Sequence, residues 1–161
     1  PPLFAGEKDG SFKQTVEALK KAIAAGNTGY FSQHVALEGI IRAKVKKYAA
    51  KAQTKGSVIT RAAGKLASFS EPAITKMASS FVLSQFSRTS PAFRKSYLNS
   101  LKLTRIGQQD QVAFAAGSFL GGLAVLSAIR SDNKWVIVGA ESPVIDREFK
   151  TMLKILHIPV N

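Results

Sequence analysis

The chain has 161 residues, of which 45% are hydrophobic and 20% are charged. This composition excludes a mainly disordered chain, and the length fits one domain, which we expect to span residues 1–161. Because the sequence has no cysteine, disulfide bonds, a cysteine nucleophile and cysteine-ligated zinc or iron–sulfur centres are also excluded.

Positive charge is concentrated in the middle of the chain. The formal net charge is +13, from 23 Lys and Arg against 10 Asp and Glu. Residues 1–38 and 110–161 are each neutral in sum, so the excess lies in residues 39–109, where Glu71 is the single acid. A block of one sign repels itself and needs an anionic partner. The block favours nucleic acid first and an anionic membrane second.

The spacing of apolar residues, mostly at steps of three and four, predicts an all-α fold. Ser11 offers an N-cap for the first helix, and serine followed by proline marks two further helix starts, at Ser90-Pro91 and Ser142-Pro143. About seven helices are predicted, over residues 11–26, 32–55, 57–69, 71–86, 90–107, 111–129 and 142–158. Before the last helix, residues 135–138 have the composition of a short extended segment. Short extended arms are expected at residues 1–8 and 158–161.

The nineteen residues 111–129 carry no charge and include a G-x-x-x-G pair, Gly117 and Gly121. As a helix they would be about 28 Å long, enough to cross a bilayer, and such a glycine pair lets membrane helices approach closely. A central helix enclosed by the others, or a helix at a subunit interface, would look the same. The buried helix is favoured, and a membrane-associated helical subunit is the alternative.

Lysines follow one face of the helix expected over residues 32–55. They recur at steps of three and four, at Lys44, Lys47, Lys51 and Lys55. This stripe is about 16 Å long, and only Glu38 and Arg42 have the spacing of a helical ion pair. Because unpaired like charges on a helix cost stability, we interpret the stripe as a site for bound anions.

A second group of cations surrounds the helix start at Ser90. Free N–H groups at a helix start bind phosphate, and arginines beside them strengthen that binding. The candidate nucleic-acid contacts are Arg42, Lys44, Lys47, Lys51, Lys55, Arg61, Lys65, Arg88, Arg94, Lys95, Lys102 and Arg105.

Four aromatic residues lie among these cations. Tyr48 and Tyr97 are the stacking candidates for bases, since their hydroxyls favour a wet edge. Phe86 and Phe93 are expected in the core.

Catalytic chemistry has little support in the sequence. The two histidines, His34 and His157, lie far apart, with no carboxylate at ligand spacing. No Walker A or Rossmann glycine pattern is present. We therefore expect no enzyme activity, no metal and no cofactor.

Three short stretches resemble nucleoproteins of phlebovirus- and tenuivirus-type RNA viruses, in the same order. They are residues 15–19, residues 85–88 with Pro91 and Arg94, and residues 147–149. The resemblance implies an all-helical protein that holds single-stranded RNA in a basic groove and polymerises through terminal arms. Arg88 and Arg94 would then lie near the groove.

These observations predict a nucleic-acid-coating structural protein, either a viral nucleoprotein or a helical coat. It would bind a phosphate backbone without sequence preference, with single-stranded RNA favoured over DNA. Apolar arm residues would dock on neighbouring subunits and build a homo-oligomer or filament, through Leu3, Phe4, Ile158 and Val160. The expected location is the virion or host cytoplasm, since no secretory signal is visible.

Overall fold

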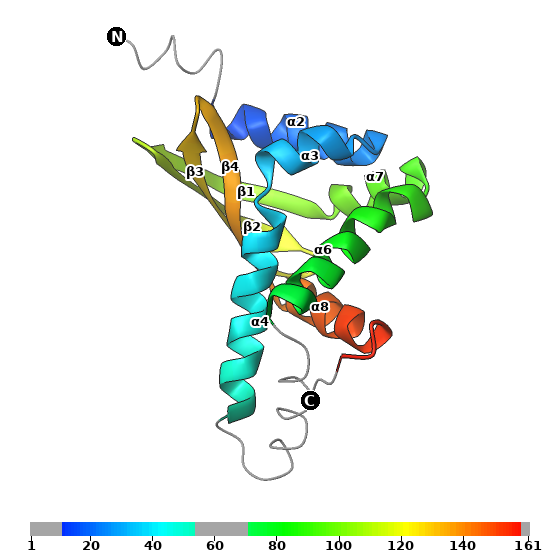
Figure 1. Cartoon of the computed structure of the whole chain (residues 1–161). Coiled ribbons are helices and arrows are strands. Elements are labelled where there is room, and N and C mark those ends of the chain that lie inside the picture. The colour runs from blue at the N-terminus through cyan, green and yellow to red at the C-terminus, as the bar shows by residue number, and fades with distance from the viewer. Residues whose placement is uncertain (1–10, 54–70, 159–161) are drawn as a thin grey trace, which may run out of the picture.

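The computed structural model of the chain describes residues 11–53 and 71–158 (Figure 1). In these residues six helices accompany a four-stranded sheet, so the fold is mixed α/β and the predicted all-α class is wrong. The elements are α2 (Phe12–Ala25), α3 (Thr28–His34), α4 (Leu37–Gln53), α6 (Glu71–Arg88), α7 (Pro91–Asn99), β1 (Leu101–Gln109), β2 (Val112–Phe119), β3 (Gly122–Ser131), β4 (Lys134–Glu141) and α8 (Pro143–Ile155).

The sheet is an antiparallel meander with strand order β1-β2-β3-β4. The β2–β3 and β3–β4 hairpins each have a two-residue turn, and both residues of each turn adopt positive φ. Leu120 and Gly121, at φ 49° and 83°, join β2 to β3. Asp132 and Asn133, at φ 49° and 61°, join β3 to β4. The short turns fix the strand register.

Residues 111–129, predicted as a helix, form the hairpin of β2 and β3. Within the described residues no helix is long and apolar enough to cross a membrane. The predicted helix over 90–107 is also too long, because α7 ends at Asn99 and β1 follows. For residues 111–129 the physical reason is that both faces of β2 and β3 carry apolar or small side chains. The polar alternation that usually marks a strand is therefore missing.

Other local predictions are confirmed. Ser11, Ser90 and Ser142 each accept a backbone hydrogen bond as the N-cap of α2, α7 and α8. Residues 135–138 lie in β4, as their composition predicted.

The helix predicted over 32–55 is interrupted, because Val35 is extended and bridges Ile137 before α4 begins.

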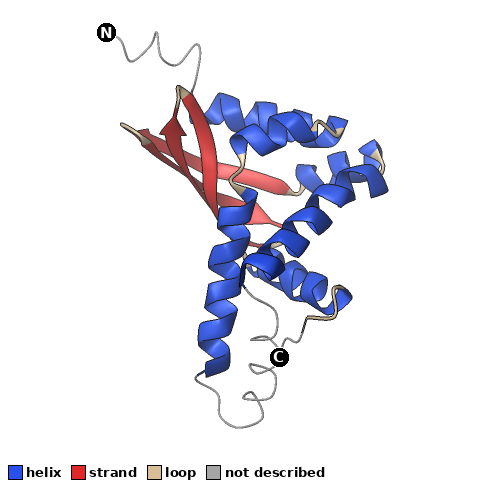
Figure 2. Ribbon diagram, in the orientation of Figure 1, coloured by secondary structure: helices blue, strands red, loops and turns tan. Residues whose placement is uncertain are grey.

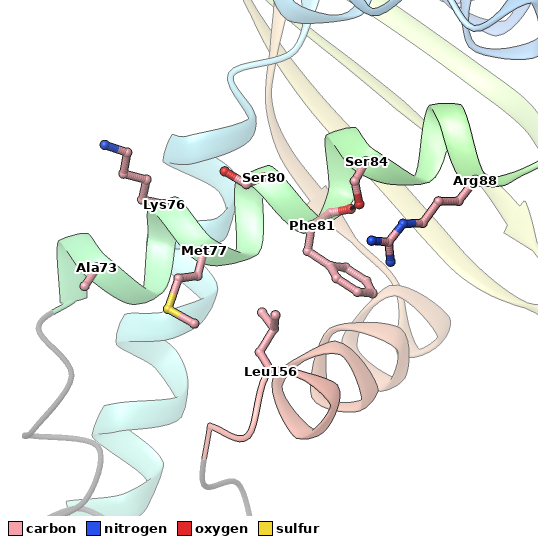
Figure 3. A pocket seen from close by; sticks show the side chains of 8 residues that line it. All are labelled: Ala73, Lys76, Met77, Ser80, Phe81, Ser84, Arg88 and Leu156. Atoms are coloured by element: carbon pink, nitrogen blue, oxygen red, sulfur yellow. Dashed lines mark hydrogen bonds between the residues drawn. The ribbon is translucent and has the colours of Figure 1, made fainter.

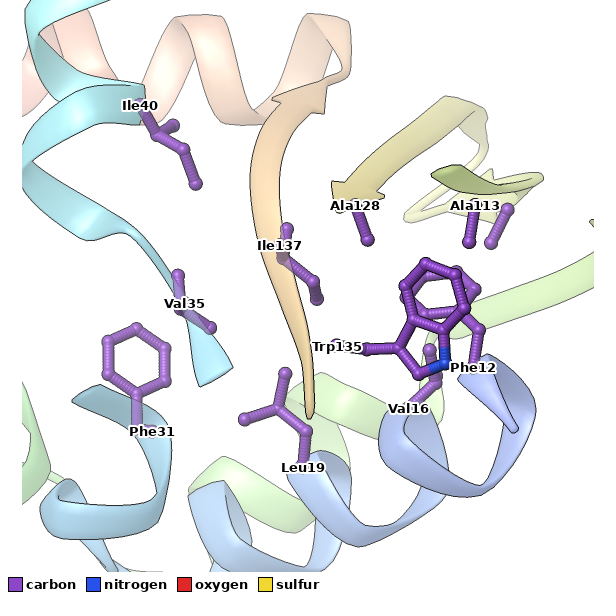
Figure 4. Packing of buried hydrophobic residues seen from close by; sticks show 11 residues of the cluster. Phe12, Val16, Leu19, Phe31, Val35, Ile40, Ala113, Ala128, Trp135 and Ile137 are labelled. Carbon is purple, nitrogen blue, oxygen red and sulfur yellow. The ribbon is translucent and has the colours of Figure 1, made fainter. Parts of the chain in front are cut away.

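The described helices pack on one side of the sheet (Figure 2). On that side Trp135 is fully buried, and the Phe12 ring meets it edge-on at 5.8 Å (Figure 4). His34 Nδ1 lies 2.9 Å from the carbonyl oxygen of Trp135. A carbonyl only accepts, so Nδ1 carries the proton. The histidine thus joins α3 to β4, a structural role.

A second core lies between α4, α6 and α8, and includes Ile41, Val45, Ile74 and Phe149. Ile158 belongs to it and is only 2% exposed. The prediction that Ile158 docks on a neighbouring subunit is therefore wrong, because this side chain is already buried in its own chain. Leu3, Phe4 and Val160, the other predicted arm residues, lie outside the described residues.

Candidate nucleic-acid interface

Cations on α4 surround one carboxylate of α6. Arg42, Lys46 and Lys47 are exposed on α4. Glu71 Oε1 lies 3.9 Å from both Arg42 Nε and Lys46 Nζ. One carboxylate facing two cations leaves a positive excess here, and exposed pairs at this distance are weak. Bound phosphate can therefore compete for these side chains.

A groove runs along α6 beside the end of α8 (Figure 3). It is shallow and open to solvent, with a volume of about 560 Å³. Met77 and Phe81 of α6 and Leu156 after α8 give it an apolar floor. Lys76 and Arg88 also line it, toward opposite ends of the helix. They are separated by about 18 Å along the helix axis.

The lining of this groove carries no negative charge, since its remaining members are Ala73, Ser80 and Ser84. Ser84 Oγ donates to the carbonyl oxygen of Phe81, so its proton is already used within the helix. Two cations separated by an apolar floor suit a ligand with repeated anionic groups and apolar faces between them. A single nucleic-acid strand has that chemistry.

An exposed aromatic pair lies on α7. Phe93 and Tyr97 stack at 6.0 Å, and Tyr97 also meets Phe119 edge-on at 5.0 Å. Phe93 is 56% exposed, so the expectation that it lies in the core is wrong. Burial, followed by the charge of Glu148, raises the pKa of Tyr97. Lys95, on the same helix, is also exposed. An aromatic pair beside a cation can take a base by stacking.

Tyr48, the other stacking candidate, is held by its own chain. Its ring stacks on Phe149 at 5.6 Å, and Lys150 Nζ lies 5.5 Å from the ring centroid. Its hydroxyl donates to the carbonyl oxygen of Asp146 at 3.3 Å. We therefore leave Tyr48 out of the interface.

Lys44 does not share an exposed stripe with Lys47. Its side chain is 6% exposed, and its Nζ lies 3.2 Å from Asp146 Oδ1 and 3.7 Å from Glu141 Oε2. Lys47 is exposed on the same helix. The predicted stripe is thus corrected, because α8 and the end of β4 cover the Lys44 position.

Arg94 is also turned inward. Its guanidinium donates to the carbonyl oxygens of Ile23 at 2.9 Å and Phe86 at 2.8 Å, and to that of Thr89. Because these carbonyls end α2 and α6, Arg94 acts here as a shared cap of two helix C-termini. Arg88, by contrast, is exposed and lines the groove.

Lys102 and Arg105 lie on β1, opposite Ser118 and Ala116 of β2. This register places them on the outer face of the sheet, away from the helices. The described cations of residues 42–105 therefore lie on more than one face of the molecule, whereas the sequence predicted one groove. Further predicted contacts lie outside the described part: the side chain of Lys51, and Lys55, Arg61 and Lys65.

The sequence pattern did not single out Lys46 and Lys76 as nucleic-acid contacts. A signal was present for Lys76, since Ala73, Lys76, Ser80 and Ser84 recur at helical steps of three and four. That these residues line a groove depends on Leu156, which follows α8 and packs beside α6.

Comparison with known proteins finds no protein-family model, no curated protein and no solved structure that matches this chain. The resemblance to viral nucleoproteins is therefore untested, and the all-helical fold that it implied is not the fold observed.

Proposed function

We propose that this protein binds single-stranded nucleic acid, without sequence preference, along the surface of α4, α6 and α7. The observation that carries the proposal is the α6 groove, which has Lys76 and Arg88 among its lining residues, an apolar floor between them and no carboxylate in the lining. Phosphates would pair with the two cations, and bases would lie on Phe81 and Met77.

The neighbouring charges support this site. Arg42, Lys46 and Lys47 extend the positive surface along α4, with Glu71 as the acid among them. At the other end, Lys95 and the Phe93–Tyr97 pair follow on α7. A coat-like mode, in which many copies cover one strand, is part of the proposal because contacts to a phosphate backbone carry no sequence information.

The test is the salt dependence of binding to labelled single-stranded RNA, single-stranded DNA and a duplex, followed by fluorescence anisotropy. The double variant Lys76→Glu/Arg88→Glu should bind more weakly. If each cation neutralises one phosphate, the log–log slope should fall by about 1.4, at about 0.7 for each contact on a single strand.

The matched control is Lys13→Glu/Lys134→Glu. Both lysines are exposed, lie outside the groove and change the net charge equally. The control should keep most of the wild-type slope. Equal losses in both double variants would mean that net charge alone attracts nucleic acid, and the groove assignment would fail. An affinity that does not change with salt would reject the function itself.

A further inference from the structure

The outer face of the sheet is apolar and lies opposite the helices (Figure 2). Leu123 is 66% exposed and Val112 is 59% exposed, and Phe114, Ile129 and Val138 are also exposed. Antiparallel sheets with one solvated face normally carry polar side chains there. Exposed apolar patches of this kind mark interaction surfaces.

Two halves of this face differ in side-chain size. Phe114 of β2 covers Gly107 of β1, where an added Cβ would lie 2.7 Å from Phe114 Cε1. In the same cross-strand row, β3 and β4 carry the small residues Ser127 and Gly139. The β1–β2 half of this row therefore carries an aromatic ring, and the β3–β4 half carries only a serine and a glycine.

Charges at the two edges of the face are opposite. In the next row, Arg105 of β1 lines up through Ala116 and Val125 with Glu141 of β4. The Glu141 side chain is 62% exposed, although its Oε2 also lies 3.7 Å from Lys44 Nζ. Thus a cation stands at one edge of the row and a carboxylate at the other.

We infer that this face binds the same face of a second copy of the chain, about a two-fold axis parallel to the strands and between β2 and β3. This rotation leaves every cross-strand row of residues at the same position along the strand direction. It places β1 of one copy over β4 of the other. Phe114 then packs on the small residues Ser127 and Gly139 of the second copy. Arg105 meets Glu141 of the second copy, and the pair forms twice by symmetry.

The size of the face agrees with such a dimer. Four strands, with eight paired positions between the central strands β2 and β3, give roughly 19 by 26 Å at the usual spacings of about 4.8 and 3.3 Å. Two faces would together bury about 1,000 Å², the lower end of specific interfaces. Sheets that pack face to face stay within about 30° of each other, which keeps the central rows in contact.

The experiment measures the mass of the full chain by sedimentation at increasing concentration. Wild type should form a dimer at micromolar concentration, and Val112→Lys should weaken dimerisation by about tenfold or more, since it buries unpaired charge. Ile155→Lys is the matched control, because Ile155 is 56% exposed but lies on α8. This variant should dimerise like wild type.

Charge exchange tests the orientation. Arg105→Glu and Glu141→Arg should each weaken the homodimer, because positions 105 and 141 then carry the same charge in both of the symmetric contacts. Mixed in equal amounts, the two variants should form a heterodimer in which both pairs are opposite in sign. Circular dichroism of each variant shows whether it is folded.

Three outcomes would overturn the inference. They are a monomeric wild type at high concentration, a dimer unaffected by Val112→Lys, and single-charge variants that do not pair when mixed. A monomer whose binding to single-stranded RNA falls with Val112→Lys would assign the face to nucleic acid instead. Because α6 is unchanged in all these variants, failure of the dimer is distinct from failure of the α6 groove.

Discussion

Arg94 Nη1 donates a hydrogen bond to the carbonyl oxygen of Phe86, 2.8 Å away, and its Nε donates to that of Ile23 at 2.9 Å. One side chain of α7 thereby caps both α2 and α6. Hydrogen bonds from a charged donor contribute about 1.5–3 kcal/mol each. Arg94→Ala should therefore lower the free energy of unfolding by about 3 kcal/mol.

Urea denaturation of the variants measures this loss. Arg94→Lys should recover less than half of it, because one ammonium cannot reach carbonyls on both helices. Arg88→Ala, an exposed arginine on α6, should stay within about 0.5 kcal/mol of wild type. Equal stability of the two alanine variants would show that Arg94 does not cap α2 and α6.

Gly117 should not tolerate a side chain. A Cβ there would lie 1.8 Å from the carbonyl oxygen of Lys102, at the bulge between Leu103 and Arg105. Since backbone must move to relieve this contact, Gly117→Ala should cost about 2–3 kcal/mol. In α4, Gly39 has nothing within 4 Å of its Cβ position. Gly39→Ala should therefore raise the free energy of unfolding by up to about 1 kcal/mol, a change opposite in sign to that of Gly117→Ala. Thermal unfolding of both variants measures the two changes.

Thr75 is a buried hydroxyl with no hydrogen-bond partner for Oγ1 among the described residues. Valine has nearly the same shape and removes the desolvated oxygen. Thr75→Val should raise the free energy of unfolding by about 1 kcal/mol. Thr151→Val is the matched change on α8, where Oγ1 donates to the carbonyl oxygen of Arg147. Thr151→Val should not raise the free energy of unfolding measured by chemical denaturation. A lower free energy of unfolding in Thr75→Val would contradict the absence of a hydrogen-bond partner for the Thr75 hydroxyl.

Tyr48 makes stability depend on alkaline pH. Burial, and then the charge of Asp146, raise the pKa of its phenol above the ordinary 10.0. The unfolded chain therefore ionises Tyr48 at lower pH than the folded chain does, so its contribution is complete below pH 10 and falls above it. When the pH is raised from neutral to above 10, the free energy of unfolding should fall less in Tyr48→Phe than in wild type. Denaturation at both pH values measures the difference, and identical pH profiles would contradict it.

Part of this structure was predictable from short segments alone. The serine caps of α2, α7 and α8 were correct, because a cap depends on residues within one helical turn. The extended segment in β4 was correct for the same reason, since β-branched residues favour it locally. Residues 111–129 were wrong, because apolar side chains on both faces of β2 and β3 hide the period of a strand.

By itself the sequence determined the charge, including the excess of cations between residues 39 and 109, and most helix starts. Only the tertiary structure decided which cations are available. Lys44 and Lys47 differ by one helical turn, yet Lys44 lies against Asp146 and Lys47 faces solvent. Only packing also placed Lys76 and Arg88 along one groove with Leu156. The reason is that charge and caps are local properties, whereas burial and grooves depend on which distant segments pack together.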